Sequence, residues 1–316
     1  MDNTEDERVI TTNQNEAQIP GSGGTDTGAM QIMVIGSGAM GRQIGMASAV
    51  AGFTTTVRDV AAEAMVEAER DMRSWLEGRV TKGRMGRDAA EAAWGRITFT
   101  TDLEPAVTTA DLIIEAATEK LDVKRAIFAE LDRLAPEHAI LATNSSTYGS
   151  SAVADATHRP EKVCNMHFFN PALVMKAVEV VRHGQTSDET VAAVEAVART
   201  MGKTPVLLNK EVPGFVANRL MGAVRSEALD LYSQGVASVE DIDEAAKNAL
   251  GYPMGPFELM DLVGLDVTYL IRQAAYELTG DESEKPHPML EEKYRAGQFG
   301  RKSGQGWYSY GQSVDT

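Results

Sequence analysis

The sequence predicts an α/β fold: a Rossmann-like domain with a mostly parallel sheet, followed by an all-helical C-terminal domain. Three observations support this class. Short apolar runs alternate with helical stretches as far as about residue 210, a glycine-rich turn follows the first apolar run, and strand-like runs stop after Pro213. Alternation of strands and helices is typical of a parallel sheet that is covered on both faces.

The expected elements follow in order from the apolar runs and their helical neighbours. We expect strands near residues 31–35, 53–59, 97–100, 112–116, 140–143, 163–168, 178–181 and 205–208. Helices are expected over 43–51, 60–94 with an interruption at 83–86, 119–134, 187–201, 216–234, 239–250 and 256–277. The β-branched run in residues 53–59 is typical of a strand.

Composition along the chain predicts three segments. Residues 1–29 are polar and cannot bury enough apolar surface to offset the entropy of ordering, so they are expected to be a disordered tail. Residues 30–210 are the expected Rossmann-like domain, and residues 211–316 are the expected helical domain. Its packing residues are expected to be Met221, Leu229, Leu231, Leu259, Leu262 and Leu265.

The overall composition excludes several classes of protein. The formal net charge of -16 over 316 residues argues against a binder of nucleic acid or of anionic membranes. Cys164 is the one cysteine, which excludes a disulfide framework and a cysteine-rich zinc site, and we expect no metal. The sequence shows neither an apolar run long enough to cross a bilayer nor a signal-peptide pattern, so we expect a cytoplasmic protein.

A glycine-rich turn lies between the first expected strand and the helix after it. Gly36, Gly38 and Gly41 form a G-x-G-x-x-G pattern, with Ala39 and Met40 inside it. Such glycines permit a tight turn, close approach of the backbone to a pyrophosphate, and close packing of helix on strand. The helix N-terminus then faces the phosphates. The pattern predicts a dinucleotide site rather than a P-loop, because no G-K-[ST] follows.

Asp59 ends the next expected strand, where a carboxylate can accept hydrogen bonds from the adenosine ribose. A carboxylate there would repel the additional phosphate of NADP, so we expect NAD. Arg58, beside it, keeps NADP open as the alternative.

Several longer motifs occur in order along residues 31–310. They are VIGSGAMG (34–41), IIEAATEKLDVK (113–124), ATNSST (142–147), HFFNPALVMKAVEV (167–180), VPGFVANR (212–219), YPMGPFELMDLVGLD (252–266) and RKSGQGWYSY (301–310). Together they resemble the 3-hydroxyacyl-CoA dehydrogenase family, especially its 3-hydroxybutyryl-CoA dehydrogenase branch. The resemblance implies NAD-dependent, reversible oxidation of an (S)-3-hydroxyacyl-CoA to the 3-ketoacyl-CoA, as in fatty acid metabolism, and a homodimer formed through the helical domain.

The same resemblance implies that His167 and Glu179 are the catalytic pair. An imidazole titrates near neutral pH and can accept the hydroxyl proton while hydride leaves for the nicotinamide. A carboxylate on the second ring nitrogen would fix the tautomer and stabilise the imidazolium. The other four histidines lie in polar or loop-like contexts and are not assigned a role.

Further site residues follow from the resemblance. Ser146 and Asn218 would bind the reacting oxygen of the substrate, and Glu119, Lys124 and Asn144 would contact the cofactor. Helix capping by Ser146 and an interdomain hydrogen bond by Asn218 are the structural alternatives. The sequence reads NSST where the family has N-T-S-S, so the sequence leaves open which hydroxyl faces the substrate.

A basic stretch in residues 70–87 stands out in this acidic chain. It contains six basic residues, including Arg79 and Lys82, against Asp71 and Glu77. Such a stretch could bind the phosphates of coenzyme A through charge-assisted contacts. The alternative is a solvated helix face with pairs of charges one turn apart.

Two other functions remain open at this point. One is an NAD-dependent sugar-acid dehydrogenase of the crystallin-like branch of the same superfamily, and the other is a non-catalytic nucleotide-sensing module. The basic stretch argues against the first, and the presence of both His167 and Glu179 argues against the second.

Overall fold

The computed structural model describes residues 30–311, so the predicted disordered tail over residues 1–29 lies outside the described residues. The chain divides into two compact units, one ending at Phe215 and the other beginning at Val216. The boundary expected at residues 210–211 falls shortly before this change. Within residues 30–311, no helix is both long and apolar enough to cross a lipid bilayer.

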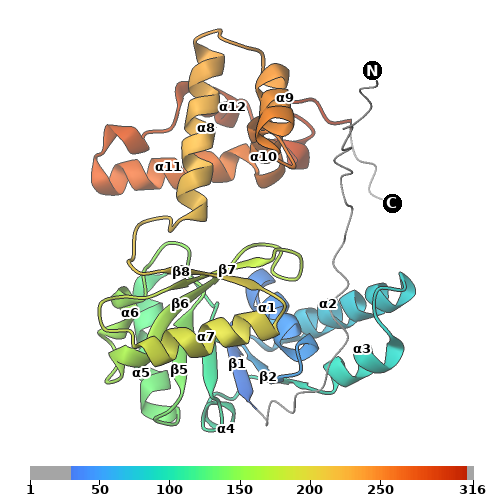
Figure 1. The fold of residues 1–316 in the computed structure, drawn as a ribbon, viewed down its shortest axis with the longest axis vertical. Helices are drawn as coiled ribbons and strands as arrows, with labels where there is room; N and C mark the ends of the chain where they lie inside the picture. The colour runs from blue at the N-terminus through green and yellow to red at the C-terminus, as the bar shows by residue number, and fades with distance from the viewer. Residues whose placement is uncertain (1–29, 312–316) are drawn as a thin grey trace, which may run out of the picture. The chain divides into compact units, whose positions relative to one another are not determined.

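The first unit is built on an eight-stranded sheet with the strand order β3-β2-β1-β4-β5-β6-β7-β8, which confirms the predicted α/β class (Figure 1). Neighbouring strands are parallel except for the antiparallel pair β6–β7. The turn over residues 169–176 is too short for a crossover, which explains this reversal. The strands are β1 (Gln31–Ile35), β2 (Thr54–Arg58), β3 (Ile97–Thr100), β4 (Leu112–Glu115), β5 (Ile140–Thr143), β6 (Val163–Phe168), β7 (Ala177–Val181) and β8 (Thr204–Leu208).

Helices cover both faces of the sheet, and in Figure 1 α7 lies across the near face. The alternation of side chains along β1 separates two cores, because successive side chains of a strand point to opposite faces. Ile32 and Val34 pack with residues of α1 and α7, whereas Met33 and Ile35 pack with α5. The helices of this unit are α1 (Ala39–Val50), α2 (Ala62–Thr81), α3 (Arg87–Trp94), α4 (Glu104–Val107), α5 (Leu121–Leu134), α6 (Ser151–Ala154) and α7 (Asp188–Thr200).

The second unit is helical, as predicted, and its described part, residues 216–311, contains only isolated β-bridges and no strand. The single helix expected over residues 256–277 is wrong. Two helices form there, because Gly264 has a φ of +107°, which is outside the helical region and is rare for residues with a Cβ. The helices are α8 (Ala217–Ser233), α9 (Val239–Leu250), α10 (Pro256–Val263), α11 (Leu265–Thr279) and α12 (Pro288–Arg295).

A buried carboxylate organises the core of the second unit. Asp261 is 1% exposed and accepts hydrogen bonds from the backbone N–H groups of Trp307 and Tyr308, both at 2.9 Å. These bonds fix the C-terminal segment against α10. Leu262, the next residue, was expected to pack internally, but it is 50% exposed because it lies on the opposite side of α10 from the buried Met260 and Asp261.

Candidate active site

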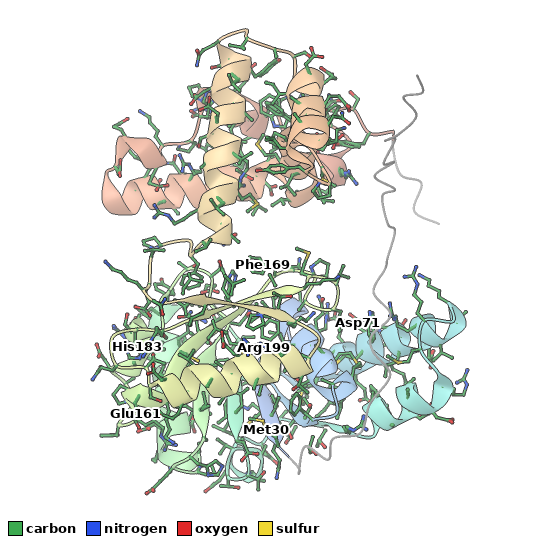
Figure 2. The ribbon with its side chains drawn as sticks, in the orientation of Figure 1. Met30, Asp71, Glu161, Phe169, His183 and Arg199 are labelled. Atoms are coloured by element: carbon green, nitrogen blue, oxygen red, sulfur yellow. The ribbon has the colours of Figure 1, made fainter. Side chains whose placement is uncertain are left out.

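The candidate site lies at the carboxyl edge of the sheet, where ligands bind in doubly wound folds. The glycine turn follows β1, the segment with Glu119 follows β4, and the loop with Asn144 and Ser146 follows β5. His167 lies near the carboxyl end of β6. Figure 2 shows Phe169, which directly follows β6, at the upper edge of this unit. The strand order therefore brings residues that are far apart in the sequence to the same edge of the sheet.

The glycine turn after β1 has the geometry of a phosphate cradle. A Cβ on Gly36 would lie 2.6 Å from the Cα of Ala117, and one on Gly41 would overlap the carbonyl oxygen of Gly36. A Cβ on Gly38, by contrast, would meet nothing within 4 Å. Open space thus lies beside the N-terminus of α1, whose first N–H groups, including those of Ala39 and Met40, have no partner within the helix. These features fit the pyrophosphate of a dinucleotide.

Asp59 is tied to the glycine turn. Its Oδ2 accepts hydrogen bonds from the backbone N–H of Ser37 at 2.7 Å and from the Ser37 hydroxyl at 3.0 Å. Its Oδ1 accepts the backbone N–H of Ala61 at 3.1 Å. Burial opposes ionisation of Asp59, but the bonds from Ser37 and Ala61 outweigh it and lower the pKa of this carboxyl. A fixed anion therefore stands beside the cradle.

His167 and Glu179 lie directly opposite each other on the antiparallel strands β6 and β7. His167 Nδ1 is 2.8 Å from Glu179 Oε2, and the two residues are 5% and 1% exposed. A carboxylate can only accept, so Nδ1 carries the proton and Nε2 carries the free lone pair. The pair is thus arranged as a base, Nε2, with a carboxylate behind it that would stabilise the protonated ring.

Two aromatic rings pack against the imidazole of His167. The ring centroid of Phe169 lies 4.6 Å away, and that of Phe215 lies 5.5 Å away. Phe215 is 2% exposed and adopts a φ of 50°, which is uncommon for a residue other than glycine. The rings restrict water around the imidazole and limit its orientation.

Asn144 connects three neighbouring strands. Its backbone N–H donates to the carbonyl oxygen of Glu115 at 2.8 Å, and its Oδ1 accepts the N–H of Phe168 at 2.9 Å. The residue predicted to contact the cofactor is therefore also bonded to the residue next to His167.

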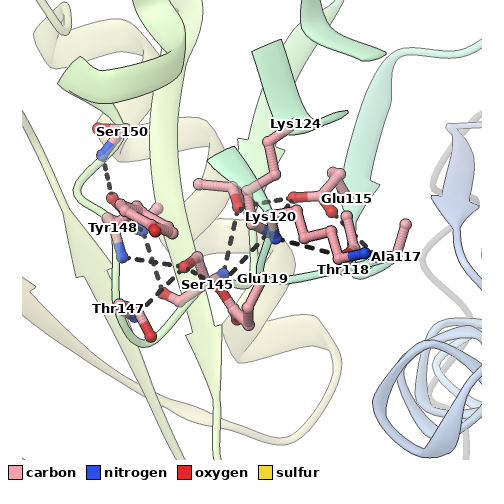
Figure 3. Close-up of polar contacts among 12 residues, drawn as sticks. Glu115, Ala117, Thr118, Glu119, Lys120, Lys124, Ser145, Thr147, Tyr148 and Ser150 are labelled. Atoms are coloured by element: carbon pink, nitrogen blue, oxygen red, sulfur yellow. Dashed lines mark hydrogen bonds and ion pairs between the residues drawn. The ribbon is translucent and has the colours of Figure 1, made fainter. Parts of the chain in front are cut away.

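Lys124, predicted to contact the cofactor, is paired with a buried carboxylate. It is 1% exposed, and its Nζ is 2.7 Å from Oε2 of Glu115, which is itself 0% exposed. The Glu119 carboxylate, 3.9 Å from Nζ, has a side chain that is 53% exposed (Figure 3). The Glu119 side chain is thus accessible, whereas the neighbouring Lys124 is buried.

The remaining predicted residues divide between the two units. Ser146 is half-buried in the loop after β5, level with the end of β6 because Thr143 pairs with Asn165 and β6 continues beyond that pair. Asn218 lies in the first turn of α8, in the second unit. Sequence reasoning missed the buried polar residues Ser37, Glu115, Thr143 and Asn165. Ser145, whose hydroxyl the sequence left open as an alternative to that of Ser146, is 1% exposed and donates to Glu119.

The basic stretch, residues 70–87, covers the second half of α2, the turn after it and the first residue of α3, and is called the basic arm below. Arg79 lies over the ring of Trp75, 5.6 Å from the centroid, and Arg73 lies 4.4 Å over Trp94. The Nε of Arg79 is buried and has no hydrogen-bond partner among the described residues. Lys82 is exposed just after α2. The arm therefore presents cations and aromatic rings together.

The chain combines a Rossmann-like domain, a helical domain and a histidine–carboxylate pair at the carboxyl edge of the sheet. This combination is typical of the class of nicotinamide-dependent dehydrogenases. Residues 31–212 match the 3-hydroxyacyl-CoA dehydrogenase NAD binding domain, and residues 214–310 match the C-terminal domain of the same family. The chain therefore belongs to the 3-hydroxyacyl-CoA dehydrogenase family, a family of oxidoreductases.

Individual relatives agree with this assignment. The 3-hydroxybutyryl-CoA dehydrogenase of Clostridioides difficile is 39% identical over 281 residues, which are 89% of this chain and 99% of the relative. The human mitochondrial hydroxyacyl-coenzyme A dehydrogenase is 37% identical over 286 residues, 88% of this chain and 90% of the relative. The crystal structure of (S)-3-hydroxybutyryl-CoA dehydrogenase from Ralstonia eutropha superimposes with a TM-score of 0.83 at 35% identity, covering 90% of this chain and all of the other.

Proposed function

We propose that this protein catalyses the reversible, NAD-linked oxidation of an (S)-3-hydroxyacyl-CoA, 3-hydroxybutyryl-CoA first among candidates, to the 3-ketoacyl-CoA. The observation that carries the proposal is the buried His167–Glu179 pair at the carboxyl edge of a dinucleotide-binding sheet. The names of the relatives from C. difficile and R. eutropha support the choice of substrate.

His167 is the base in this proposal. Its Nε2 takes the proton of the 3-hydroxyl group as the C–H bond at the same carbon breaks and the C=O bond forms. Bound NAD supplies the nicotinamide ring that receives the hydride. Glu179 stabilises the imidazolium through Nδ1, at 2.8 Å, and returns the ring to the same tautomer after each turnover. The reverse reaction uses the imidazolium as the acid.

Ser146 and Asn218 are proposed to bind the reacting oxygen, Ser146 from the loop after β5 and Asn218 from α8. A hydroxyl or amide donor aimed at this oxygen stabilises the negative charge that develops on it. Glu119 and Asn144 are proposed to border the cofactor.

NAD rather than NADP is proposed on the basis of Asp59. Its carboxylate carries a lowered pKa and lies beside the glycine cradle, where an additional phosphate would be repelled. Arg58 donates from Nε to the carbonyl oxygen of Thr101 at 3.2 Å, which draws part of its guanidinium toward the backbone.

The basic arm of α2 and α3 is proposed to hold the phosphates of coenzyme A, with Arg79 and Lys82 as ligands. The buried, unbonded Nε of Arg79 supports this role, because a phosphate oxygen would give it a charge-assisted hydrogen bond.

A homodimer through the helical unit is proposed from its exposed apolar side chains. Val267, Leu270 and Ile271 are 37–64% exposed and share one side of α11, because they are spaced by three and four residues. Leu262 and Val263, at the end of α10, are 50% and 42% exposed. Exposed apolar side chains gathered on one helix face favour a protein interface. Light scattering of the wild type and of Leu270→Glu tests this proposal; a monomeric wild type contradicts it.

A cytoplasmic location is also proposed.

The function is tested by following NADH oxidation with acetoacetyl-CoA in the wild type and in His167→Gln. We expect turnover in the wild type and a loss of kcat of about 10²- to 10⁴-fold in the variant. An inactive wild type contradicts the proposed reaction, and full activity in the variant contradicts the role of His167. NADPH measured in parallel tests the proposal about Asp59.

A further inference from the structure

The loop between β5 and α6, residues 144–150, carries Ser146 and is held from two sides by buried polar side chains. On one side is Ser145, which is 1% exposed. Its hydroxyl donates to Glu119 Oε2 at 2.7 Å and accepts the backbone N–H groups of Thr147 at 3.2 Å and Tyr148 at 3.0 Å (Figure 3). The residues on both sides of Ser146 are therefore fixed by a single oxygen.

The backbone of Ser145 is held as well. Its N–H donates to Oγ1 of Thr143 at 3.2 Å, and this hydroxyl donates to Oε2 of Glu115 at 2.8 Å. Oε2 of Glu115 also receives Nζ of Lys124. Nζ of Lys124 also lies 3.9 Å from Oε2 of Glu119, which accepts the Ser145 hydroxyl. These contacts therefore form a closed network around the buried ion pair of Glu115 and Lys124 (Figure 3). A loop anchored in this way has little freedom to shift.

Asn165 holds the loop from the other side. It is 0% exposed and lies two residues before His167 on β6, so both side chains point to the same face of the sheet. Its Nδ2 donates to the carbonyl oxygens of Ser145 at 3.2 Å and Tyr148 at 3.0 Å, and its Oδ1 accepts the N–H of Ser150 at 2.6 Å. The strand that presents His167 is thus bonded directly to the loop that presents Ser146.

We propose that Ser145 and Asn165 are positioning residues that fix Ser146 relative to His167, an inference that rests on the proposed function. Neither side chain reaches the substrate in this proposal. Each acts through the loop, and a displacement of a catalytic group by about 1 Å can lower a rate by about 10²-fold. Threonine supplies the same hydroxyl as Ser145 and is therefore the conservative replacement at this position.

Ser145→Thr and Ser145→Val form a matched pair, because the two side chains have the same shape and only threonine keeps the hydroxyl. We expect Ser145→Thr to retain wild-type kcat and Ser145→Val to lose about 10- to 100-fold, with a smaller change in KM. Asn165→Asp should lose a similar factor, because a carboxylate cannot donate to the two carbonyl oxygens. Equal kcat in the threonine and valine variants overturns the role of Ser145.

Thr186→Val is the control for general destabilisation. Thr186 is 2% exposed, and its hydroxyl donates to the carbonyl oxygen of Val163 at 2.7 Å, at the opposite end of β6 from His167. We expect this variant to lower Tm as much as Ser145→Val does while leaving kcat unchanged. If it lowers kcat equally, the effect is one of stability and the inference fails.

Two further measurements complete the test. In a Ser146→Ala background, Ser145→Val should have little additional effect on kcat, because the two residues act as a unit; a full additional loss contradicts the inference. Hydrogen exchange over residues 144–150 should accelerate in Ser145→Val and in Asn165→Asp, whether or not acetoacetyl-CoA is a substrate. Unchanged exchange overturns the inference by itself, whereas an inactive wild type overturns only the proposed function.

Discussion

The carboxyl edge of the sheet and the basic arm of α2 and α3 bear polar groups of very different kinds. At the edge, Glu115, Lys124 and Glu179 are at most 1% exposed and bonded to one another or to neighbouring side chains. On the arm, Lys82 is exposed and Arg79 lies against Trp75. The polar side chains at the edge are held in place by burial and hydrogen bonds, whereas the arm presents positive charge.

This difference matches what the two regions are proposed to do. Transfer of a proton and a hydride requires atoms held to within a fraction of an ångström. Anchoring a long, flexible polyanion requires only a favourable field with a few donors. Substitutions at the edge should therefore change kcat or stability, and substitutions on the arm should change KM alone.

The largest effect is expected for Glu179→Gln. The neutral amide cannot stabilise the imidazolium of His167, so kcat should fall about 10²- to 10⁴-fold while KM for acetoacetyl-CoA changes little. Steady-state kinetics in both directions measure this effect. If Glu179→Gln raised KM and left kcat unchanged, the proposed difference between the edge and the arm would be contradicted.

Lys124→Met should affect stability most. It leaves Glu115 buried without its cation, which costs about 3–5 kcal/mol in the free energy of unfolding. The double variant Glu115→Gln, Lys124→Met should recover part of this loss, because no buried charge remains. Thermal and urea unfolding test both variants. A single variant as stable as the wild type would show that the pair contributes nothing.

Arg79→Ala should raise KM for acetoacetyl-CoA about three- to tenfold and leave kcat unchanged, since one charged contact contributes about 1 kcal/mol at a partly exposed site. Acetoacetyl-pantetheine lacks the phosphates and should be used equally well by wild type and variant. Arg199→Ala is the matched control, because Arg199 is an exposed arginine on α7 (Figure 2). If Arg199→Ala raises KM equally, the arm is not a specific site.

The smallest effect is a pH dependence at Asp59. The pKa of this carboxyl is lowered in the folded protein, so its contribution to stability is complete above the ordinary value of 3.8 and is lost as the pH falls through the lowered pKa. Asp59→Asn should therefore lower Tm by a few degrees at neutral pH. The difference between wild type and variant should vanish in acid, and a difference independent of pH would contradict this.

Much of the fold could be predicted because its signals are local. The strand β1, the glycine turn and the helix α1 could be predicted from apolar periodicity and from the spacing of the glycines. Gly41 is required by the carbonyl oxygen of Gly36, a near neighbour in the chain, whereas the crowding of Gly36 by Ala117 arises only in the tertiary structure. The break at Gly264 could not be predicted, because a glycine inside an apolar helical pattern is compatible with either a continuous or an interrupted helix. Leu262 was misassigned for a related reason: a helix of eight residues has too few turns to define its buried side.

By itself, the sequence determined the fold class and the dinucleotide turn. Its ordered motifs also determined the family, and the family in turn implied the roles of His167 and Glu179. Only the tertiary structure decided which polar residues are buried together. The pairing of His167 with Glu179 depends on the antiparallel register of β6 and β7, and the bonds of Ser145 and Asn165 depend on how three strand ends meet. Such contacts join residues that have no common periodicity in the chain, and they form only when burial makes an unbonded polar group too costly.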